Sequence, residues 1–156
     1  MSESRFLIEP ASPLSEEVAP LLKRHWQHTI DHSPPGGCYT FTAQELAEPD
    51  VTFWTAREDG DVVGFVALKQ RSDSFGELKS LHVAEQMRGS GLGQALVQTV
   101  IGAARAKGLT ELGLETGRSE GFAASRRLYE REGFVHGPVF APYECGTFSY
   151  CMTRPI

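Results

Sequence analysis

Residues 75–108, FGELKSLHVAEQMRGSGLGQALVQTVIGAARAKG, decide the fold of this chain. A strand ends near Val83, a glycine-rich loop covers residues 88–93, and a helix then runs to Gly108, which follows it as a C-terminal cap. The helix is predicted by apolar residues at helical spacing, Leu92, Leu96, Val100 and Ala103. Because the first N–H groups of a helix lack intrahelical partners and lie at the positive end of its dipole, the loop indicates a phosphate-binding site.

The spacing of the glycines excludes two common phosphate-binding loops. The dinucleotide fingerprint G-x-G-x-x-G would need a glycine at Gln94, and the Gly-Lys-Ser/Thr of the P-loop does not occur. The pattern that remains is R-x-x-G-x-G, from Arg88 to Gly93. A tight strand-to-helix turn that binds nothing stays an alternative.

The strand before the loop has an irregular apolar pattern. Its inward positions are Leu78 and then Leu81 and Val83, so the pattern slips by one residue near Lys79 and Ser80. Such a slip predicts a β-bulge, which would splay the strand from its neighbour. The alternative is that residues 79–80 mark the end of a strand.

The composition predicts one soluble globular domain covering residues 1–156. A hydrophobic content of 40% without a long apolar run indicates no membrane span and no signal peptide, so we expect a cytoplasmic protein. The net charge of -5 argues against a nucleic-acid partner and favours a cationic or amine partner. The cysteines Cys38, Cys145 and Cys151 lack metal-type spacing, and we expect reduced thiols.

The other elements follow from periodicity and turn signals. Pro20 marks the first turn of one helix, Thr42 and Glu45 form a capping box, and Asp59-Gly60 predicts a hairpin. Further helices are expected at about 18–32, 42–47 and 121–131, and further strands at 5–9, 51–57, 62–70, 111–116, 134–136 and 147–153. The order β-α-α-β-β-β-α-β-α-β-β predicts an α/β (α+β) domain with a mixed sheet flanked by helices.

Three stretches resemble the GNAT superfamily of N-acetyltransferases. Residues 83–96 resemble its acyl-CoA pyrophosphate loop, residues 128–134 match its L-Y-x-x-x-G-F motif, and residues 114–117 precede that motif as in the superfamily. The order of elements is also similar over nearly the whole chain. Ser33-Pro34-Pro35-Gly36 and the ending 143–152 resemble a subgroup of small bacterial acetyltransferases. Phe122 departs from the pattern, because an asparagine that contacts the cofactor is common there.

The resemblance implies a GNAT-like, mostly antiparallel mixed sheet with a splayed, bulged central strand. It also implies acetyl-CoA as co-substrate, with no metal. The residues implied to bind it are Leu81, His82, Val83, Arg88, Gly89, Ser90, Gly91, Leu92, Gly93, Ser125 and Tyr129. A backbone N–H near residues 81–83 would hold the oxyanion.

Two residues are candidates for proton transfer. The resemblance places Tyr129 beside the cofactor sulfur as general acid, and a core tyrosine that holds helix to sheet is the alternative. Glu77 is the candidate base, since a protonated amine must lose a proton at neutral pH; an ordered water or a solvent-facing role for Glu77 are the alternatives.

The acceptor site is expected to involve His25, Glu77 and Tyr143, with Glu144 and Phe148 at its border. His25, His28 and His32 stand at helical spacing, which leaves a metal site open, although His25 on the apolar face favours the core or the acceptor pocket. Arg126 and Arg127 could reach CoA phosphates or lie on a solvated helix face.

The leading functional hypothesis is an acetyl-CoA-dependent N-acetyltransferase acting on a primary amine of a small molecule or peptide. A non-catalytic acyl-CoA-binding or regulatory module of the same fold is the alternative, and a nucleotide-binding enzyme lacks a fingerprint. We expect no nucleic-acid or membrane partner. The acceptor and the oligomeric state, a homodimer included, stay open.

Overall fold

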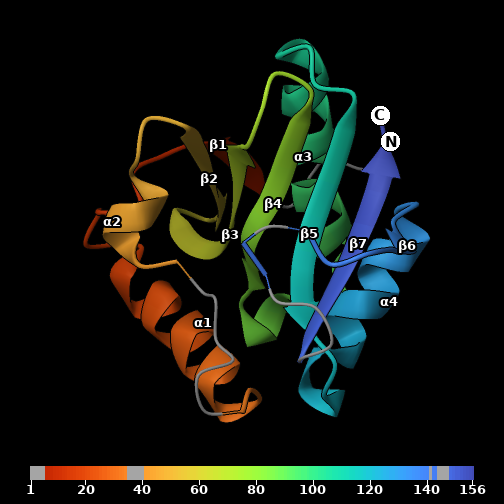
Figure 1. The fold of residues 1–156 in the computed structure, drawn as a ribbon. Coiled ribbons are helices and arrows are strands. Elements are labelled where there is room, and N and C mark those ends of the chain that lie inside the picture. The colour runs from red at the N-terminus through yellow and green to blue at the C-terminus, as the bar shows by residue number, and fades with distance from the viewer. Residues whose placement is uncertain (1–5, 35–40, 141, 144–147) are drawn as a thin grey trace.

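The computed structural model describes residues 6–34, 41–140, 142–143 and 148–156. Within these ranges the strands form one sheet in the order β1-β2-β3-β4-β5-β7-β6 (Figure 1). The strands are β1 (Leu7–Pro10), β2 (Val51–Glu58), β3 (Asp61–Gln70), β4 (Phe75–Val83), β5 (Glu111–Gly117), β6 (Val135–His136) and β7 (Ser149–Pro155). The helices are α1 (Ala19–Asp31), α2 (Ala43–Leu46), α3 (Leu92–Ala106) and α4 (Ala123–Arg131), with 3-10 turns η1 (Glu85–Met87) and η2 (Glu120–Phe122).

The predicted order of helices and strands is confirmed. The capping box at α2 is present, since Thr42 Oγ1 accepts from the Glu45 N–H at 3.2 Å and the Thr42 N–H donates to Glu45 Oε1 at 2.9 Å. The β2–β3 hairpin turns at Asp59 and Gly60, whose φ angles are 52° and 88°. Such angles match a primed turn, which the Asp-Gly signal favours.

Element boundaries differ from the predictions by up to two residues. The first strand is β1 at Leu7–Pro10 rather than 5–9, and the last strand runs over Ser149–Pro155 rather than 147–153. Residues 35–37 of the predicted turn lie outside the described residues, as do Cys38, Glu144 and Cys145. Cys151 is a buried free thiol.

The bulge predicted in β4 is confirmed by its register against β3. Phe65 pairs with His82 and Ala67 pairs with Lys79, so two residues of β4 oppose the single residue Val66. Ser80, in the bulge, has a φ of 56°. The apolar pattern of the strand therefore slips at the position that the sequence indicates.

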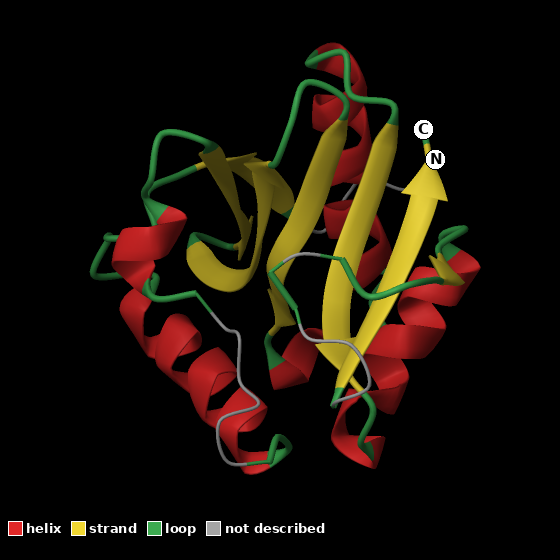
Figure 2. Ribbon diagram, viewed as in Figure 1, coloured by secondary structure: helices red, strands yellow, loops and turns green. Residues whose placement is uncertain are grey.

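β4 and β5 diverge after a short parallel pairing, and this divergence is here called the fork. The pairs run only from Phe75–Glu111 to Leu78–Leu114. Beyond them, residues 79–83 of β4 follow β3, and residues 115–117 of β5 pair with β7 (Figure 2). The β4 edge that faces β5 is therefore unpaired from Lys79 onward.

Helix α3 packs behind the sheet, opposite the viewer in Figure 1. Its residues Leu92, Leu96 and Val100 are fully buried. A Cβ added at Gly64 of β3 would lie 3.1 Å from Leu92 Cδ2 and 3.4 Å from Leu96 Cδ1, so the glycine lets the helix approach the sheet closely. This contact positions the start of α3 beside the end of β4.

In the described part of the chain, no helix is long and apolar enough to cross a membrane. The cytoplasmic location stays a prediction. The oligomeric state stays undecided.

Leu96→Ala tests the packing of α3 on the sheet. The side chain is fully buried, so its truncation should lower the free energy of unfolding by about 3 kcal/mol, as measured by urea denaturation. The control is Arg105→Ala on the exposed face of the same helix, which should change it by less than about 0.5 kcal/mol. Equal effects of both changes would contradict this packing.

Candidate active site

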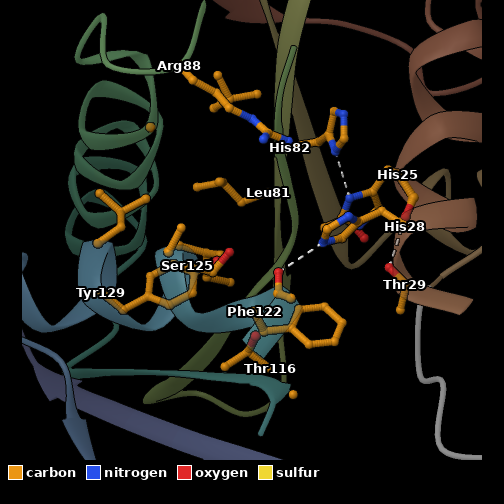
Figure 3. A pocket seen from close by; sticks show the side chains of 18 of the residues that line it. His25, His28, Thr29, Leu81, His82, Arg88, Thr116, Phe122, Ser125 and Tyr129 are labelled. Atoms are coloured by element: carbon orange, nitrogen blue, oxygen red, sulfur yellow. Dashed lines mark hydrogen bonds between the residues drawn. The ribbon is translucent and has the colours of Figure 1, made fainter. Parts of the chain in front are cut away.

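A groove with a volume of about 690 Å³ occupies the fork. Its walls come from α1, the second half of β4, the loop at 88–91, the start of α3, the end of β5 and α4. Figure 3 shows Tyr129 and Ser125 on one side of the groove and His25, His28 and Thr29 on the other, with Leu81 between them. The groove thus joins elements that are more than a hundred residues apart in the sequence.

The glycine loop forms one end of the groove. Gly89 and Gly91 have φ angles of 78° and 89°, the left-handed region that favours glycine. A Cβ at either position would meet nothing within 4 Å, so the space in front of the α3 N-terminus is open. Because the N–H groups of the first helical turn lack intrahelical partners, this end fits an anionic group such as a pyrophosphate.

Two residues of the loop pattern have a different role. A Cβ at Gly93 would lie 3.0 Å from Leu128 Cδ2, so this glycine allows α3 to pack against α4. Ser90 does not line the groove, and its Oγ accepts a hydrogen bond from the Leu92 N–H at 3.3 Å. Gly93 therefore both lines the groove and sets the helix contact, whereas Ser90 supports the start of α3 from outside the groove.

Tyr129 lines the groove from α4, beside the fork. Its side chain is almost fully buried, and its ring lies edge to face with Phe134, with 6.0 Å between the centroids. Burial, and to a smaller extent the charge of Glu115, raise the pKa of its phenol above the ordinary value. The hydroxyl therefore keeps its proton at neutral pH.

Glu115 lines the groove from β5, one residue beyond the last β4–β5 pair. The neighbours on its face of the strand are Gly113 and Gly117. A Cβ at Gly113 would touch Phe75 at 2.5 Å, and a Cβ at Gly117 would touch Phe122 at 2.3 Å, so aromatic rings lie directly on the strand.

The environment of Glu115 changes its acidity. Burial raises the pKa of this carboxyl to about 7, and Glu77 adds to the rise, while Ser149 and Lys79 lower the pKa by less. The buried Oγ of Ser149 has no hydrogen-bond partner in the described structure, so its effect on the pKa of Glu115 is weak. A carboxyl with a pKa near 7 can both take up and release a proton at neutral pH.

His25 and His82 form a pair on the groove wall. Their Nδ1 atoms lie 3.1 Å apart, so one ring donates to the other, and both rings contact Phe65. Burial, with their mutual charge repulsion at His25, lowers the pKa of His25 to about 3, and burial lowers the pKa of His82 to about 4. Both rings are therefore neutral at pH 7.

His28 holds α1 against the entry to α4. Its Nε2–H donates to the Gly121 carbonyl at 3.1 Å, and burial lowers its pKa. Among the described residues, no three His, Cys, Asp or Glu side chains are placed to hold a metal ion. The spacing of the α1 histidines instead places their rings where they pack across the groove.

Glu77 and Tyr143 lie beside the groove but not on its wall. The Glu77 side chain has no exposed surface; Arg71 Nε donates to its Oε1 at 2.8 Å and the Tyr143 hydroxyl donates to its Oε2. Lys79 Nζ donates to the Tyr143 hydroxyl at 2.8 Å. A role for Glu77 as base stays a hypothesis, and its enclosed carboxylate has no direct contact with the groove.

Residues 16–134 match the Acetyltransferase (GNAT) family. The chain belongs to this family. It is 31% identical over 140 residues to the uncharacterized N-acetyltransferase YsnE of Bacillus subtilis (strain 168), covering 90% of this chain and 93% of that protein. It is 34% identical over 146 residues to IAA acetyltransferase of Azospirillum brasilense, covering 93% and 94%. The crystal structure of a Klebsiella pneumoniae protein assigned as an acyl-CoA N-acyltransferase is 29% identical and superposes with a TM-score of 0.76, covering 96% and 97%.

Family membership makes this GNAT protein an acetyl-CoA-dependent N-acetyltransferase, which favours the enzyme over the non-catalytic binding module. Most of the predicted site residues line one groove: His25, Leu81, His82, Val83, Arg88, Gly89, Gly91, Leu92, Gly93, Ser125 and Tyr129. Ser90, Glu77 and Tyr143 do not. Arg126 donates hydrogen bonds to the Gly117 and Ser119 carbonyls. These bonds hold its guanidinium at the end of β5.

Sequence reasoning gave no role in this GNAT site to Glu115, considered His28 only as one of three histidines that could bind a metal, and treated Phe122 only as a departure from the pattern. One signal was present for Glu115. The run Gly113-Leu114-Glu115-Thr116-Gly117 places two glycines on the same strand face as the carboxylate. Glycine within a strand often marks close approach by another group, here the aromatic rings.

The raised pKa of Glu115 predicts a pH-dependent stability. Because ionisation is disfavoured in the folded state, the parent should lose stability as the pH rises from 4.5 toward 7. Glu115→Gln lacks this loss, so its free energy of unfolding relative to the parent should increase over that window, by on the order of 3 kcal/mol. Urea denaturation at several pH values measures the difference. Parallel pH profiles for parent and variant would show that Glu115 titrates normally.

Proposed function

We propose that this enzyme transfers the acetyl group of acetyl-CoA to the nitrogen of a primary amine, on a small molecule or a peptide, by direct attack in the groove. The observation that carries this proposal is the fork, which connects an anion-binding loop, an unpaired strand edge and two proton-transfer groups in one groove. When bound, acetyl-CoA supplies the activated thioester.

The loop and the strand edge are suited to orient the thioester. The α3 N-terminus with Gly89 and Gly91 would hold the pyrophosphate, and Arg88 beside it adds positive charge. The β4 edge at residues 79–83 lacks β5 as a partner, so its backbone groups can bind an extended acyl arm. An N–H in this segment can also stabilise the negative charge that develops on the carbonyl oxygen.

Glu115 is the group we assign to take the proton from the acceptor ammonium. It is on the groove wall and has a pKa near the working pH, which is the property a general base needs. Glu77 lies on the same sheet face but is enclosed by Arg71 and Tyr143. Proton transfer to Glu77 would therefore need an intervening water, whereas Glu115 can face the amine directly.

Tyr129 is the group we assign to donate a proton to the departing thiolate. The neutral amine attacks the thioester carbon, the carbon–sulfur bond breaks, the sulfur takes the phenolic proton, and the nitrogen loses its extra proton to solvent as the amide forms. The raised pKa keeps that proton on Tyr129 before the reaction. The phenolate is afterwards reprotonated from solvent as CoA leaves.

Gly91→Glu should weaken acetyl-CoA binding at least tenfold. The change puts a side chain and a negative charge into the open space before the α3 N-terminus, at a φ of 89° that strains any residue other than glycine. The matched control is Gly102→Glu in the same helix, where a Cβ also meets nothing within 4 Å but the loop is distant. Calorimetry measures both, and equal affinities for the two variants would refute the loop assignment.

Tyr129→Phe should lower kcat by about a hundredfold while leaving the affinity for acetyl-CoA nearly unchanged, because only the proton donor is removed. Release of free thiol with a competent amine measures kcat. Tyr150→Phe is the control, since Tyr150 stacks on His136 outside the groove. If Tyr129→Phe affected affinity alone, Tyr129 would be a binding residue.

A further inference from the structure

One end of the groove is lined by aromatic rings from η2, from the residue just before β7 and from α1. Phe122 lies 5.9 Å from Phe148 between ring centroids, at an interplanar angle of 67°, and 5.6 Å from His28 at 83°. All three residues line the groove. The hydrogen bond from His28 to the Gly121 carbonyl joins these elements across the groove (Figure 3). This end, here called the aromatic end, is therefore a built wall and not a chance exposure of one ring.

The aromatic end continues directly from Glu115. A Cβ at Gly117 would lie 2.3 Å from Phe122 and 2.4 Å from Phe148, so both rings rest on the β5 backbone at this glycine. Gly117 is two residues from Glu115 on the same face of the strand, roughly 6.5 Å along it. A group held at Glu115 can therefore reach the rings through a stem of about two carbons.

The charged groups around Glu115 disfavour a carboxylate on the acceptor. Lys79 lines the groove, but its ammonium contacts the Tyr143 hydroxyl, lies 3.6 Å from Glu77 Oε2 and sits 4.1 Å from the centre of the Phe41 ring. Burial also lowers its pKa. The histidines His25 and His82 are neutral at pH 7, so they offer an acceptor carboxylate little charge.

We propose that the acceptor is an arylalkylamine, a primary amine on a short alkyl stem that carries an aromatic ring and no carboxylate. Its ring packs against Phe122 and Phe148, and its amine lies at Glu115. Edge-to-face contacts favour an aromatic over an aliphatic body of similar size. This inference rests on the proposed function and names the substrate class for the same groove.

The first experiment compares kcat/KM for four amines at saturating acetyl-CoA: 2-phenylethylamine, tryptamine, n-hexylamine and phenylalanine. We expect kcat/KM for both arylalkylamines to exceed that for n-hexylamine about tenfold, through a lower KM. We expect it to exceed that for phenylalanine by more, because Lys79 is engaged by Tyr143 and Glu77, and the neutral His25 and His82 offer a carboxylate little charge. Equal or higher values for n-hexylamine or for phenylalanine would overturn the assignment of the substrate class.

The second experiment locates the preference. Phe148→Ala should raise KM for 2-phenylethylamine about tenfold and lower the ratio of kcat/KM for 2-phenylethylamine to that for n-hexylamine by a similar factor. Phe148→Leu, which keeps most of the apolar volume, should show a smaller loss and serves if the alanine variant does not fold. The control is Phe140→Leu, because Phe140 packs on Phe75 and does not line the groove. Retained aryl preference in both Phe148 variants would overturn the proposed wall.

Calorimetry of 2-phenylethylamine against the enzyme–CoA complex separates this inference from the proposed function. Tighter binding than n-hexylamine that is lost in Phe148→Ala, or weakened in Phe148→Leu, supports the aromatic end even if no amine is acetylated. That lack of turnover would refute the proposed function alone. Acetylation of all four amines without aryl preference would support the function and overturn the inference. Absence of both binding and turnover would overturn both.

Discussion

The extra residue in β4 at Ser80 is the constraint on which the site depends. Up to Leu78 the strand pairs with β5, and beyond the bulge it follows β3 alone. If the ladder continued in register, the β4 backbone groups would be bonded to β5 and the groove would be closed. The bulge thus creates both the space and the unpaired backbone groups that a thioester needs. The adjacent loop and α3 follow within ten residues, so the strand edge and the helix N-terminus meet.

A buried charge network stands just before the fork. Glu77 has no exposed surface, and a carboxylate in such a place is tolerable only when it is paired and hydrogen-bonded. Arg71, Lys79 and Tyr143 provide those partners, with Tyr143 arriving from the segment before β7. The network therefore ties the two halves of the sheet together where their strands begin to separate. Its position explains why a glutamate can lie so near the chemistry and yet be enclosed.

The fork also brings side chains from the two faces of the sheet close together. Leu112 and Leu114 point to the face that α3 covers, as does Gly64 on β3, whereas Glu115 and Gly117 point to the other face. Tyr129 reaches the groove from α4, and His25 reaches it from α1. The cofactor loop and the acceptor wall can therefore meet at the fork without competing for the same surface. A regular sheet would separate these faces completely.

Sequence periodicity and turn chemistry were enough for the order of the elements, the hairpin at Asp59-Gly60, the capping box at Thr42 and the bulge, because each depends on residues close together in the chain. The positions of the glycine loop and of the motif containing Tyr129 could also be predicted from the sequence, since the loop depends on local backbone shape and the motif lies in one short helix. Other properties depend on distant partners. The enclosure of Glu77 requires Tyr143, 66 residues away, and the raised pKa of Glu115 requires its burial by the folded chain, with a smaller contribution from the charge of Glu77. Burial and the local dielectric are set by whatever the folded chain brings together, so only the tertiary structure could decide which of two glutamates is enclosed and which lines the groove.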